Sequence, residues 1–283
     1  MIDPMTFEAC GSGRWFPSDG MRLRGLLNRF IDEADALVEA PREIVGGIAP
    51  HAGLDISGPV AAYTFAALRK SCRQFGVPDF VSVLGFSHRE SYPALALLNA
   101  EAFRTPMATS AIATDAVETL CGSCGHIVAD SEPHFGEHSA ENIIPFVQHV
   151  LPDCPLLVGL FGTHDDHVCG EIASAFRALM AGRHGLLLAS TDLLHDPDYD
   201  RVTTTDSETL RQIAALDRAG LRERWHPHNQ VCCGLAPVTT MLDALVGVEG
   251  IGGRILRYRN CGDDYPETRG EWVVGYGAVV FEC

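Results

Sequence analysis

The chain has 283 residues, of which 46% are hydrophobic and 20% charged, so it can bury a substantial core and is not a disordered polymer. Its 21 basic and 37 acidic side chains give a formal net charge of −16, the wrong sign for following a phosphate backbone, and we expect no nucleic-acid partner. The first residues lack a secretory signal and no stretch approaches the roughly 20 apolar residues of a membrane span, so we expect a cytoplasmic protein without a membrane partner.

Apolar runs and helical patterns alternate along the first half of the chain. An N-terminal extension and a first helix are expected within residues 1–40, followed by a strand over 44–49. Pro59 is suited to the first position of a helix that continues through 60–68. Further predictions are a strand over 80–84, an extended segment over 95–104 and a helix over 114–120.

The second half continues the alternation. Residues 139–150 predict a helix that Pro145 either kinks or begins. The continuous apolar runs 156–161 and 186–190 are typical of central strands covered on both faces. Helices are predicted over 168–180, 206–219 and 236–246, and strands over 254–258 and 273–281. The pattern predicts one domain over 1–283, a three-layer α/β/α sandwich with a mostly parallel or mixed central sheet.

Titratable residues follow three of the predicted strands. His51 follows the first strand, His88 follows the second, and Asp192 and His195 follow the run 186–190. In open α/β sheets, reactive groups gather beyond the carboxyl ends of the strands, so these four side chains are expected at one rim. A lone histidine in such a position is usually an ordinary loop residue, and it is the conjunction that indicates a site.

Cysteine and histidine together suggest a metal. Glu137 and His138 precede one predicted helix, and Cys232 and Cys233 precede another. Neutral imidazole and thiolate suit Fe(II), Cu or Zn, whereas Mg and Ca would call for carboxylates and carbonyls. Two histidines and one anionic ligand would leave open coordination positions for a substrate or dioxygen.

These residues lie in motifs that resemble the Memo family, relatives of the LigB-like class III extradiol ring-cleavage dioxygenases. The motifs occur in family order from about residue 42 to the end. They are Pro50-His51-Ala52-Gly53 with Ser57-Gly58, Gly85-Phe86-Ser87-His88, Glu137-His138-Ser139 with Glu141 and Pro145-Phe146, Ser190-Thr191-Asp192-Leu193-Leu194-His195, Cys233-Gly234 with Pro237, and Val274-Gly275-Tyr276-Gly277.

The resemblance implies a LigB-type domain with a metal held by His51, His88 and Cys233, where the ring-cleaving relatives use two histidines and a glutamate. It also implies that His195 is the catalytic acid/base, with Asp192 beside it. The family's Cys-Gly register favours Cys233 over the neighbouring Cys232 as the ligand.

The substrate pocket that the resemblance implies includes His138, together with Glu137 and Ser87 from the same motifs. Two departures from the family pattern alter its wall. Asp55 stands where the family usually has an aromatic residue, and Arg89 replaces a second histidine. We expect these residues to place one charge of each sign near the metal and to change the substrate.

The leading functional hypothesis is therefore a non-haem iron oxidoreductase that activates O₂, with a small molecule such as a catechol as substrate. A second hypothesis is a non-catalytic or redox Memo-type protein that binds copper, iron or a peptide. A third is a zinc-dependent hydrolase with His195 or Asp192 as the base. Acidic chains of this kind often self-associate, so a homo-oligomer is also expected.

Other polar residues have simpler interpretations. The ten cysteines are interpreted as mostly reduced, and the spacing of Cys121 and Cys124 as an incidental turn. Glu141 can simply charge a helix start. His164 and His167 are interpreted as surface residues. His228, in a polar loop together with His226, is expected to approach the pocket only because Cys233 lies shortly downstream.

Overall fold

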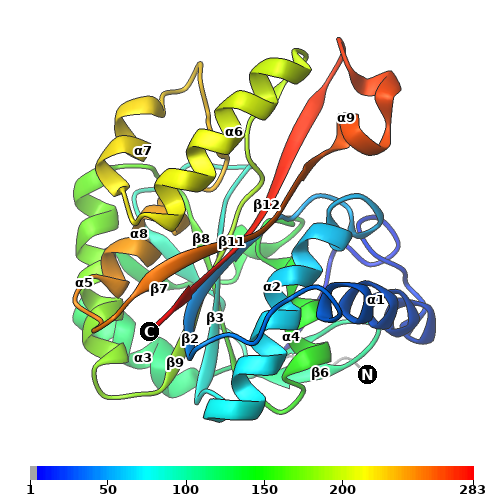
Figure 1. The fold of residues 1–283 in the computed structure, drawn as a ribbon. Helices are drawn as coiled ribbons and strands as arrows, with labels where there is room; N and C mark the ends of the chain where they lie inside the picture. The colour runs from blue at the N-terminus through cyan, green and yellow to red at the C-terminus, as the bar shows by residue number, and fades with distance from the viewer. Residues whose placement is uncertain (1–4) are drawn as a thin grey trace.

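The computed structural model describes residues 5–283, whose strands form one large mixed sheet and one small sheet (Figure 1). The order in the large sheet is β10-β12-β2-β9-β3-β8-β4-β7, and β11 also pairs with β12. Its four central strands run parallel to one another. They are β2 (Ile44–Ala49), β9 (Gly185–Ser190), β3 (Phe80–Phe86) and β8 (Leu156–Phe161).

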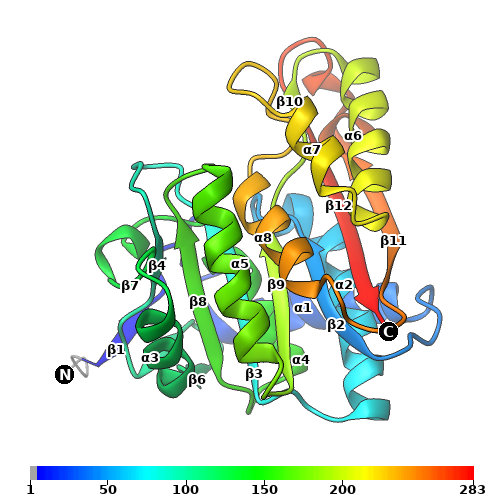
Figure 2. The ribbon, with the colours of Figure 1, turned by 90° about the vertical axis from the view of Figure 1, so that its left-hand side faces the viewer.

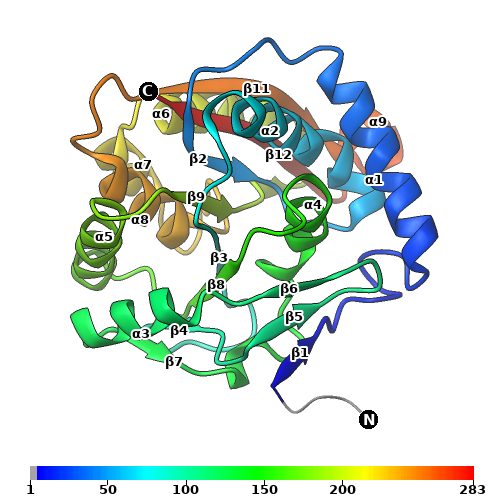
Figure 3. The ribbon, with the colours of Figure 1, turned by 90° about the horizontal axis from the view of Figure 1, so that it is seen from below.

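Antiparallel strands flank the parallel centre, which confirms the prediction of a mostly parallel, mixed sheet. β12 runs antiparallel to β2 and also pairs with β10 and β11, while β4 runs antiparallel to β8 and parallel to β7. These strands are β12 (Val273–Glu282), β10 (His195–Asp196), β11 (Gly252–Asn260), β4 (Leu95–Leu97) and β7 (Ile127–Ala129). The small sheet (Figure 3) pairs the first strand of the described chain with two later strands. It consists of β1 (Thr6–Glu8), β5 (Ala102–Arg104) and β6 (Thr109–Ala111).

Helices cover both faces of the large sheet, as predicted for an α/β protein. On one face α2 packs against β2 and β12 and is itself covered by α1 and α4. On the other face α8 packs against β2, β3 and β9, with α5 and α3 beyond it, and α6 covers β11 and β12 (Figure 2). The bounds are α1 (Gly20–Asp35), α2 (Leu54–Phe75), α3 (Thr114–Ser123), α4 (Ile144–Val150), α5 (Asp166–Met180), α6 (Tyr199–Ala214), α7 (Arg218–Arg224), α8 (Leu235–Leu245) and α9 (Cys261–Asp264).

The central strands form because their residues are apolar on both faces. Every residue of β8 and β9 is buried, so each side of the sheet must be covered by a helix layer. Phe65 of α2 and Phe146 of α4 stack with ring centroids 4.9 Å apart in the layer over one face. Burial of each such ring contributes about 1.5–3 kcal/mol to stability. Among residues 5–283, no helix combines the length and the apolar character needed to cross a bilayer.

Helix α2 begins earlier than the sequence pattern predicts. Pro59 does not start it, because the helix already begins at Leu54 and contains Pro59 in its interior. The N–H of Leu54 donates to the carbonyl of Trp15 at 2.8 Å, which satisfies one of the free donors of the first turn. The stabilising partner comes from a distant segment, so the local pattern did not reveal it.

The prediction of one helix over 206–219 is wrong in its bounds. α6 starts at Tyr199, where the carboxylate of Asp198 accepts hydrogen bonds from the N–H groups of Asp200 and Arg201 at 2.9 and 3.0 Å. The chain then breaks at Leu216, whose φ of 55° ends the helix, and α7 follows. The start of α6 is therefore set by the Asp198 cap and not by the spacing of apolar residues.

Two other segments are divided differently from the prediction. The extended run 95–104 forms two strands, β4 and β5, which belong to different sheets. The run 139–150 begins with the 3₁₀ turn η2 (Glu141–Ile143), and Pro145 lies in the first turn of α4, so this proline marks the start of the helix rather than a kink. Two further 3₁₀ turns are η1 (Glu132–His134) and η3 (Pro266–Thr268).

Candidate metal centre

Three adjacent parallel strands deliver polar residues to the same edge of the sheet. β2, β9 and β3 are neighbours, with β9 in the middle. His51, Asp192 and His88 each lie two residues beyond the end of one of these strands. Because parallel strands end at the same edge, the three side chains converge although they are far apart in the sequence.

Cys233 approaches them from the loop before α8, two residues before that helix begins. Its Sγ lies 3.4 Å from Nε2 of His51. One ligand atom from each of His51, His88 and Cys233 lies within 4.8 Å of the other two. Gly234 permits this approach, because a Cβ at that position would come 2.6 Å from the carbonyl oxygen of Ser190.

A serine determines which nitrogen of His51 carries the proton. Ser190 Oγ donates its only hydrogen to the carbonyl of Ser139, so it can only accept from Nδ1 of His51, which lies 2.9 Å away. Nε2 of the neutral ring is therefore unprotonated and faces the sulfur of Cys233. A lone pair directed at a thiol is suited to metal ligation.

Glu137 has the same effect on His88. The N–H of His88 donates to Oε2 at 2.7 Å, and Nδ1 lies 3.1 Å from Oε1 of the same carboxylate. An ionised carboxylate only accepts, so Nδ1 carries hydrogen and Nε2 is the remaining nitrogen. Burial lowers the pKa of His88, but hydrogen bonds to Cys233 and Glu137 outweigh it and raise the pKa to about 9.

The Glu137 side chain contacts the rings of His88 and His138 and is fully buried. Oε1 also accepts from the N–H groups of His138 and Ser139 at 2.8 and 2.9 Å. Burial by itself would raise the pKa of Glu137, but hydrogen bonds from His138 and His88 lower it well below its usual range. The sequence placed Glu137 in the substrate pocket, whereas in the structure its oxygens are occupied in holding two histidines.

His138 lies next to both histidines of the candidate ligand set. Its ring centroid is 5.5 Å from that of His51 and 5.1 Å from that of His88. Trp15 stacks on the outer side of His138 at 4.5 Å with an interplanar angle of 12°. Trp15 was not identified from the sequence, because nothing local in the N-terminal segment indicates that it folds against a motif more than a hundred residues away.

A buried carboxylate holds the segment that carries Trp15. Glu141 accepts hydrogen bonds from the N–H groups of Cys10, at 2.8 Å, and of Gly11. Burial raises the pKa of Glu141 to about 7, although these hydrogen bonds oppose the shift. A Cβ at Gly11 would come 2.6 Å from this carboxylate, so the glycine is needed for the close approach. Glu141 therefore has a tertiary role beyond charging a helix start.

Asp192 forms hydrogen bonds with two of the candidate ligand residues, His51 and Cys233. Its Oδ1 accepts from the N–H of His51 at 2.8 Å. Its own N–H points at the sulfur of Cys233 at 3.3 Å, and its carbonyl accepts from the N–H of Cys233 at 3.2 Å. Asp192 is buried, so its principal contacts hold the backbone of two candidate ligands.

His195 is exposed, and its ring lies edge-on to Trp272 at 5.9 Å. Although the residue is exposed, partial desolvation lowers the pKa of His195; Asp192 opposes this shift, and His51 and His88 add to it. His195 and Cys233 line one cavity of about 230 Å³. The other residues lining it are Leu193, Leu194, Asp196, Arg201, Pro227, His228, Asn229, Gln230 and Trp272. His228 thus approaches the pocket as expected.

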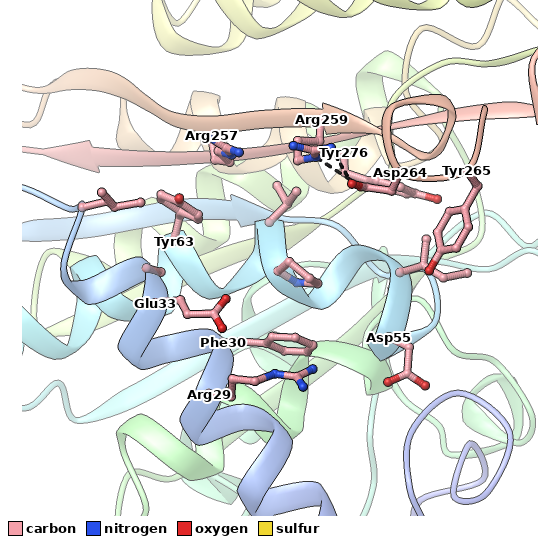
Figure 4. Close-up of a pocket in the computed structure, with 15 residues that line it drawn as sticks. Arg29, Phe30, Glu33, Asp55, Tyr63, Arg257, Arg259, Asp264, Tyr265 and Tyr276 are labelled. Carbon is pink, nitrogen blue, oxygen red and sulfur yellow. Dashed lines mark hydrogen bonds and ion pairs between the residues drawn. The ribbon is translucent and has the colours of Figure 1, made fainter.

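The side chains of the other three residues assigned to the substrate pocket make contacts outside the candidate ligand set. Ser87 is buried, and its hydroxyl accepts from the N–H of Glu90 at 3.2 Å, which holds the turn after β3. Arg89 is exposed and donates to the carbonyl of Gly136 at 3.4 Å. Asp55, on the first turn of α2, faces a groove between α1 and β11 (Figure 4). None of these three side chains belongs to the cluster of candidate ligand atoms in residues 5–283.

The groove in Figure 4, at about 460 Å³, is larger than the cavity of about 230 Å³ beside Cys233, but it contains none of the three candidate ligands. Its charged side chains balance in sign. Arg259 is paired with Asp264, with Nε 3.1 Å from Oδ2, and Arg257 lies over the ring of Tyr63 at 5.5 Å. The remaining charges are those of Arg29, Glu33 and Asp55. The larger of the two cavities is therefore not the one that adjoins the converging histidines and sulfur.

The interpretation of His164 as a surface residue is wrong. Its ring stacks on Phe86 at 3.8 Å and contacts Trp225 at 4.4 Å, and burial lowers its pKa to about 4. His167 is exposed as expected. Cys121 and Cys124 are free thiols, and no candidate metal cluster within residues 5–283 includes them. Cys232 is buried in the hydrophobic core, so Cys233 supplies the sulfur at the centre.

Comparisons with known proteins support one family. A model of Memo-like proteins matches residues 8–280. A MEMO1 family protein from Methanopyrus kandleri is 31% identical over 282 residues, covering 95% of this chain and 96% of the relative. A MEMO1 family protein from Thermoplasma volcanium is 30% identical over 275 residues, with 95% of this chain and 96% of the relative covered.

Solved structures add a similarity of fold. An uncharacterized protein from Escherichia coli K12 superposes with a TM-score of 0.54, covering 85% of this chain and 100% of that chain. The two sequences are 13% identical, so this similarity concerns the fold alone.

Proposed function

Because the chain belongs to the Memo-like protein family, we propose that it is a metal-dependent oxidoreductase whose iron is held by His51, His88 and Cys233. The observation that carries the proposal is the convergence of two imidazoles and one thiol within 4.8 Å. Nδ1 of each imidazole faces a protein acceptor, so Nε2 is the nitrogen available to a metal that displaces its proton.

The donor set fits a transition metal. Imidazole nitrogen and thiolate sulfur bind ions of the Zn class at about 2.0–2.3 Å, so ligand atoms around a common ion lie roughly 3.5 Å apart. The 3.4 Å between His51 Nε2 and Cys233 Sγ agrees with that spacing. Nitrogen and sulfur suit Fe(II), Cu or Zn, and three protein ligands leave coordination positions open. Fe(II) is the proposed working metal.

Bound Fe(II) would supply a place for O₂ and a substrate hydroxyl side by side. The chain supplies the proton transfer. His195 lines the adjoining cavity and its pKa is lowered, so at neutral pH its ring is uncharged and able to accept a proton from a substrate. Asp192 begins the loop that leads to His195, and its carboxylate holds the backbone of His51.

The cavity supports a small, flat substrate. Its volume of about 230 Å³ has room for a single aromatic ring, and Trp272 offers a face against which such a ring can pack. Polar groups from the loop around His228 can meet hydroxyls on the ring. A catechol-like phenol is therefore the proposed substrate class.

Anaerobic reconstitution with Fe(II), followed by oxygen-uptake measurements on a panel of catechols and other phenols, tests the proposal. We expect uptake with at least one phenol and its loss in His195→Ala while iron remains bound. His167→Ala, which changes an exposed histidine, is the control and should leave uptake unchanged.

Two results would contradict the oxidoreductase proposal. Tight binding of iron or copper with no oxygen uptake on any compound would favour a non-catalytic metal-binding protein. Oxygen-independent cleavage of an ester or amide by the zinc-loaded protein would favour a hydrolase.

A further inference from the structure

A buried carboxylate outside the candidate ligand set holds the loop between Asp192 and His195. Asp206, on α6, is completely buried. Its Oδ1 accepts from the N–H of Leu194 at 3.0 Å, and its Oδ2 accepts from the hydroxyl of Tyr258 at 2.9 Å. Burying an aspartate is unfavourable unless its oxygens are hydrogen-bonded, and both oxygens of Asp206 have a partner.

The neighbouring strand makes room for this carboxylate. A Cβ at Gly275 of β12 would lie 1.7 Å from Oδ2 of Asp206, so only glycine allows the carboxylate to occupy its position. Gly275 also pairs with the same loop. Its carbonyl accepts from the N–H of Leu193 at 2.8 Å, and its N–H donates to the carbonyl of Leu194 at 3.1 Å. Asp206 and Gly275 together satisfy the N–H groups of Leu193 and Leu194 and the carbonyl of Leu194.

That loop contacts two of the three candidate metal ligands. Asp192 directs its N–H at the sulfur of Cys233 at 3.3 Å, and its carboxylate accepts from the N–H of His51 at 2.8 Å. Asp206 touches neither ligand itself. A displacement of the Leu194 backbone would nevertheless be passed on through Asp192 to both ligands, because the intervening residues are buried and hydrogen-bonded.

We propose that Asp206 is a positioning residue of the metal centre, which fixes the backbone of Leu194 and thereby the placement of Asp192, Cys233 and His195. This inference rests on the proposed metal function of the His51–His88–Cys233 site. It assigns to α6 and β12 an indirect part in the geometry of a site whose ligands lie in the loops after β2 and β3 and before α8.

Co(II) serves as the probe, because its absorption reports a bound thiolate directly. We expect Asp206→Ala to weaken Co(II) binding by about tenfold or more and to alter the thiolate band. Asp206→Asn should stay close to wild type, because its amide oxygen can still accept from Leu194. Tyr258→Phe removes only the other partner of Asp206, and Glu208→Gln changes a half-exposed residue of the same helix that pairs with Arg211, so both should leave Co(II) binding nearly unchanged.

Wild-type Co(II) affinity and an unchanged thiolate band in folded Asp206→Ala would overturn the inference and leave Asp206 with a stabilising role only. If the wild-type protein binds no metal, the proposed function fails, and the rate at which iodoacetamide alkylates Cys233 in the apo-protein then decides the inference. We expect that rate to change severalfold in Asp206→Ala and to return in Asp206→Asn. Equal rates in all three proteins would overturn it.

Discussion

At the residue scale, the hydrogen-bond partner of each imidazole determines which of its nitrogens can bind a metal. Ser190 accepts from Nδ1 of His51, and Glu137 accepts from Nδ1 of His88, so Nε2 is the nitrogen of each ring that remains for a metal, which would displace any proton held there. Partners of this kind orient metal-binding histidines and raise their basicity. The sequence does not reveal these hydrogen bonds, because Ser190 and Glu137 are distant in the chain from His51 and His88 and meet them only in the folded protein.

Ser190→Ala is therefore expected to weaken metal binding by about 10- to 100-fold, since His51 loses the acceptor that fixes its ring. Ser82→Ala is a matched control, because Ser82 is also a buried strand serine and its hydroxyl has no hydrogen-bond partner. Isothermal titration with Co(II) measures both affinities. An equal affinity in the two variants would show that the Ser190 hydroxyl does not orient His51.

Asp206 also makes a prediction about stability and pH. Burial raises its pKa from 3.8 to about 7, while hydrogen bonds from Leu194 and Tyr258 oppose the shift. The folded state therefore holds its proton more tightly than the unfolded state does. The stabilising contribution is complete below pH about 4 and is lost as the pH rises to about 7.

Asp206→Asn carries no such titration. Relative to wild type, its unfolding free energy should therefore increase between pH 4.5 and 7.5, by on the order of 1–3 kcal/mol. Urea denaturation at both pH values measures the difference. A mutant-to-wild-type difference that is the same at both pH values would contradict the raised pKa of Asp206.

At the element scale, close approaches between backbones place the ends of helices at the site. α8 can begin beside β9 because Gly234 has no side chain to meet the Ser190 carbonyl. α2 begins at Leu54 because the Trp15 carbonyl accepts its N–H. The apolar runs predicted the central strands well, whereas helix starts of this kind depend on residues that are distant in the sequence. That dependence explains why the prediction began α2 at Pro59.

Gly234→Ala should lower both stability and metal affinity, because the added Cβ would force α8 away from Ser190. Gly170→Ala in α5 is the control. A Cβ there would meet nothing within 4 Å, and alanine in a helix is favoured over glycine by about 0.5–1 kcal/mol, so this variant should be more stable than wild type. Thermal unfolding and Co(II) titration measure the two effects. Two variants that gain stability alike would refute the close-approach argument.

The N-terminal segment gives a second prediction at this scale. Glu141→Ala removes the acceptor for the N–H groups of Cys10 and Gly11, so the segment carrying Trp15 should open more often. Hydrogen-exchange mass spectrometry should show faster exchange in residues 8–18. Peptides from β3 serve as the internal control and should be unchanged. Unaltered protection of residues 8–18 would show that other contacts hold the segment.

At the scale of the whole molecule, strand order turns distant sequence motifs into one site. The neighbouring positions of β2, β9 and β3 bring His51, Asp192 and His88 to a single edge. The alternation of strands and helices predicted this fold class, and the residues at the strand ends indicated the centre. Long-range packing was beyond the sequence pattern, which is why Trp15, the buried position of Glu137 and the stacking of His164 emerged only from the structure.

X-ray absorption spectroscopy of the Fe(II)-loaded protein identifies the atoms bound to iron and so tests the proposed ligand set. If His51, His88 and Cys233 hold the iron, its spectrum contains one sulfur and at least two imidazole nitrogens, and Cys233→Ser removes the sulfur contribution. A spectrum without sulfur in the wild-type protein, or with sulfur retained after that substitution, would contradict that ligand set.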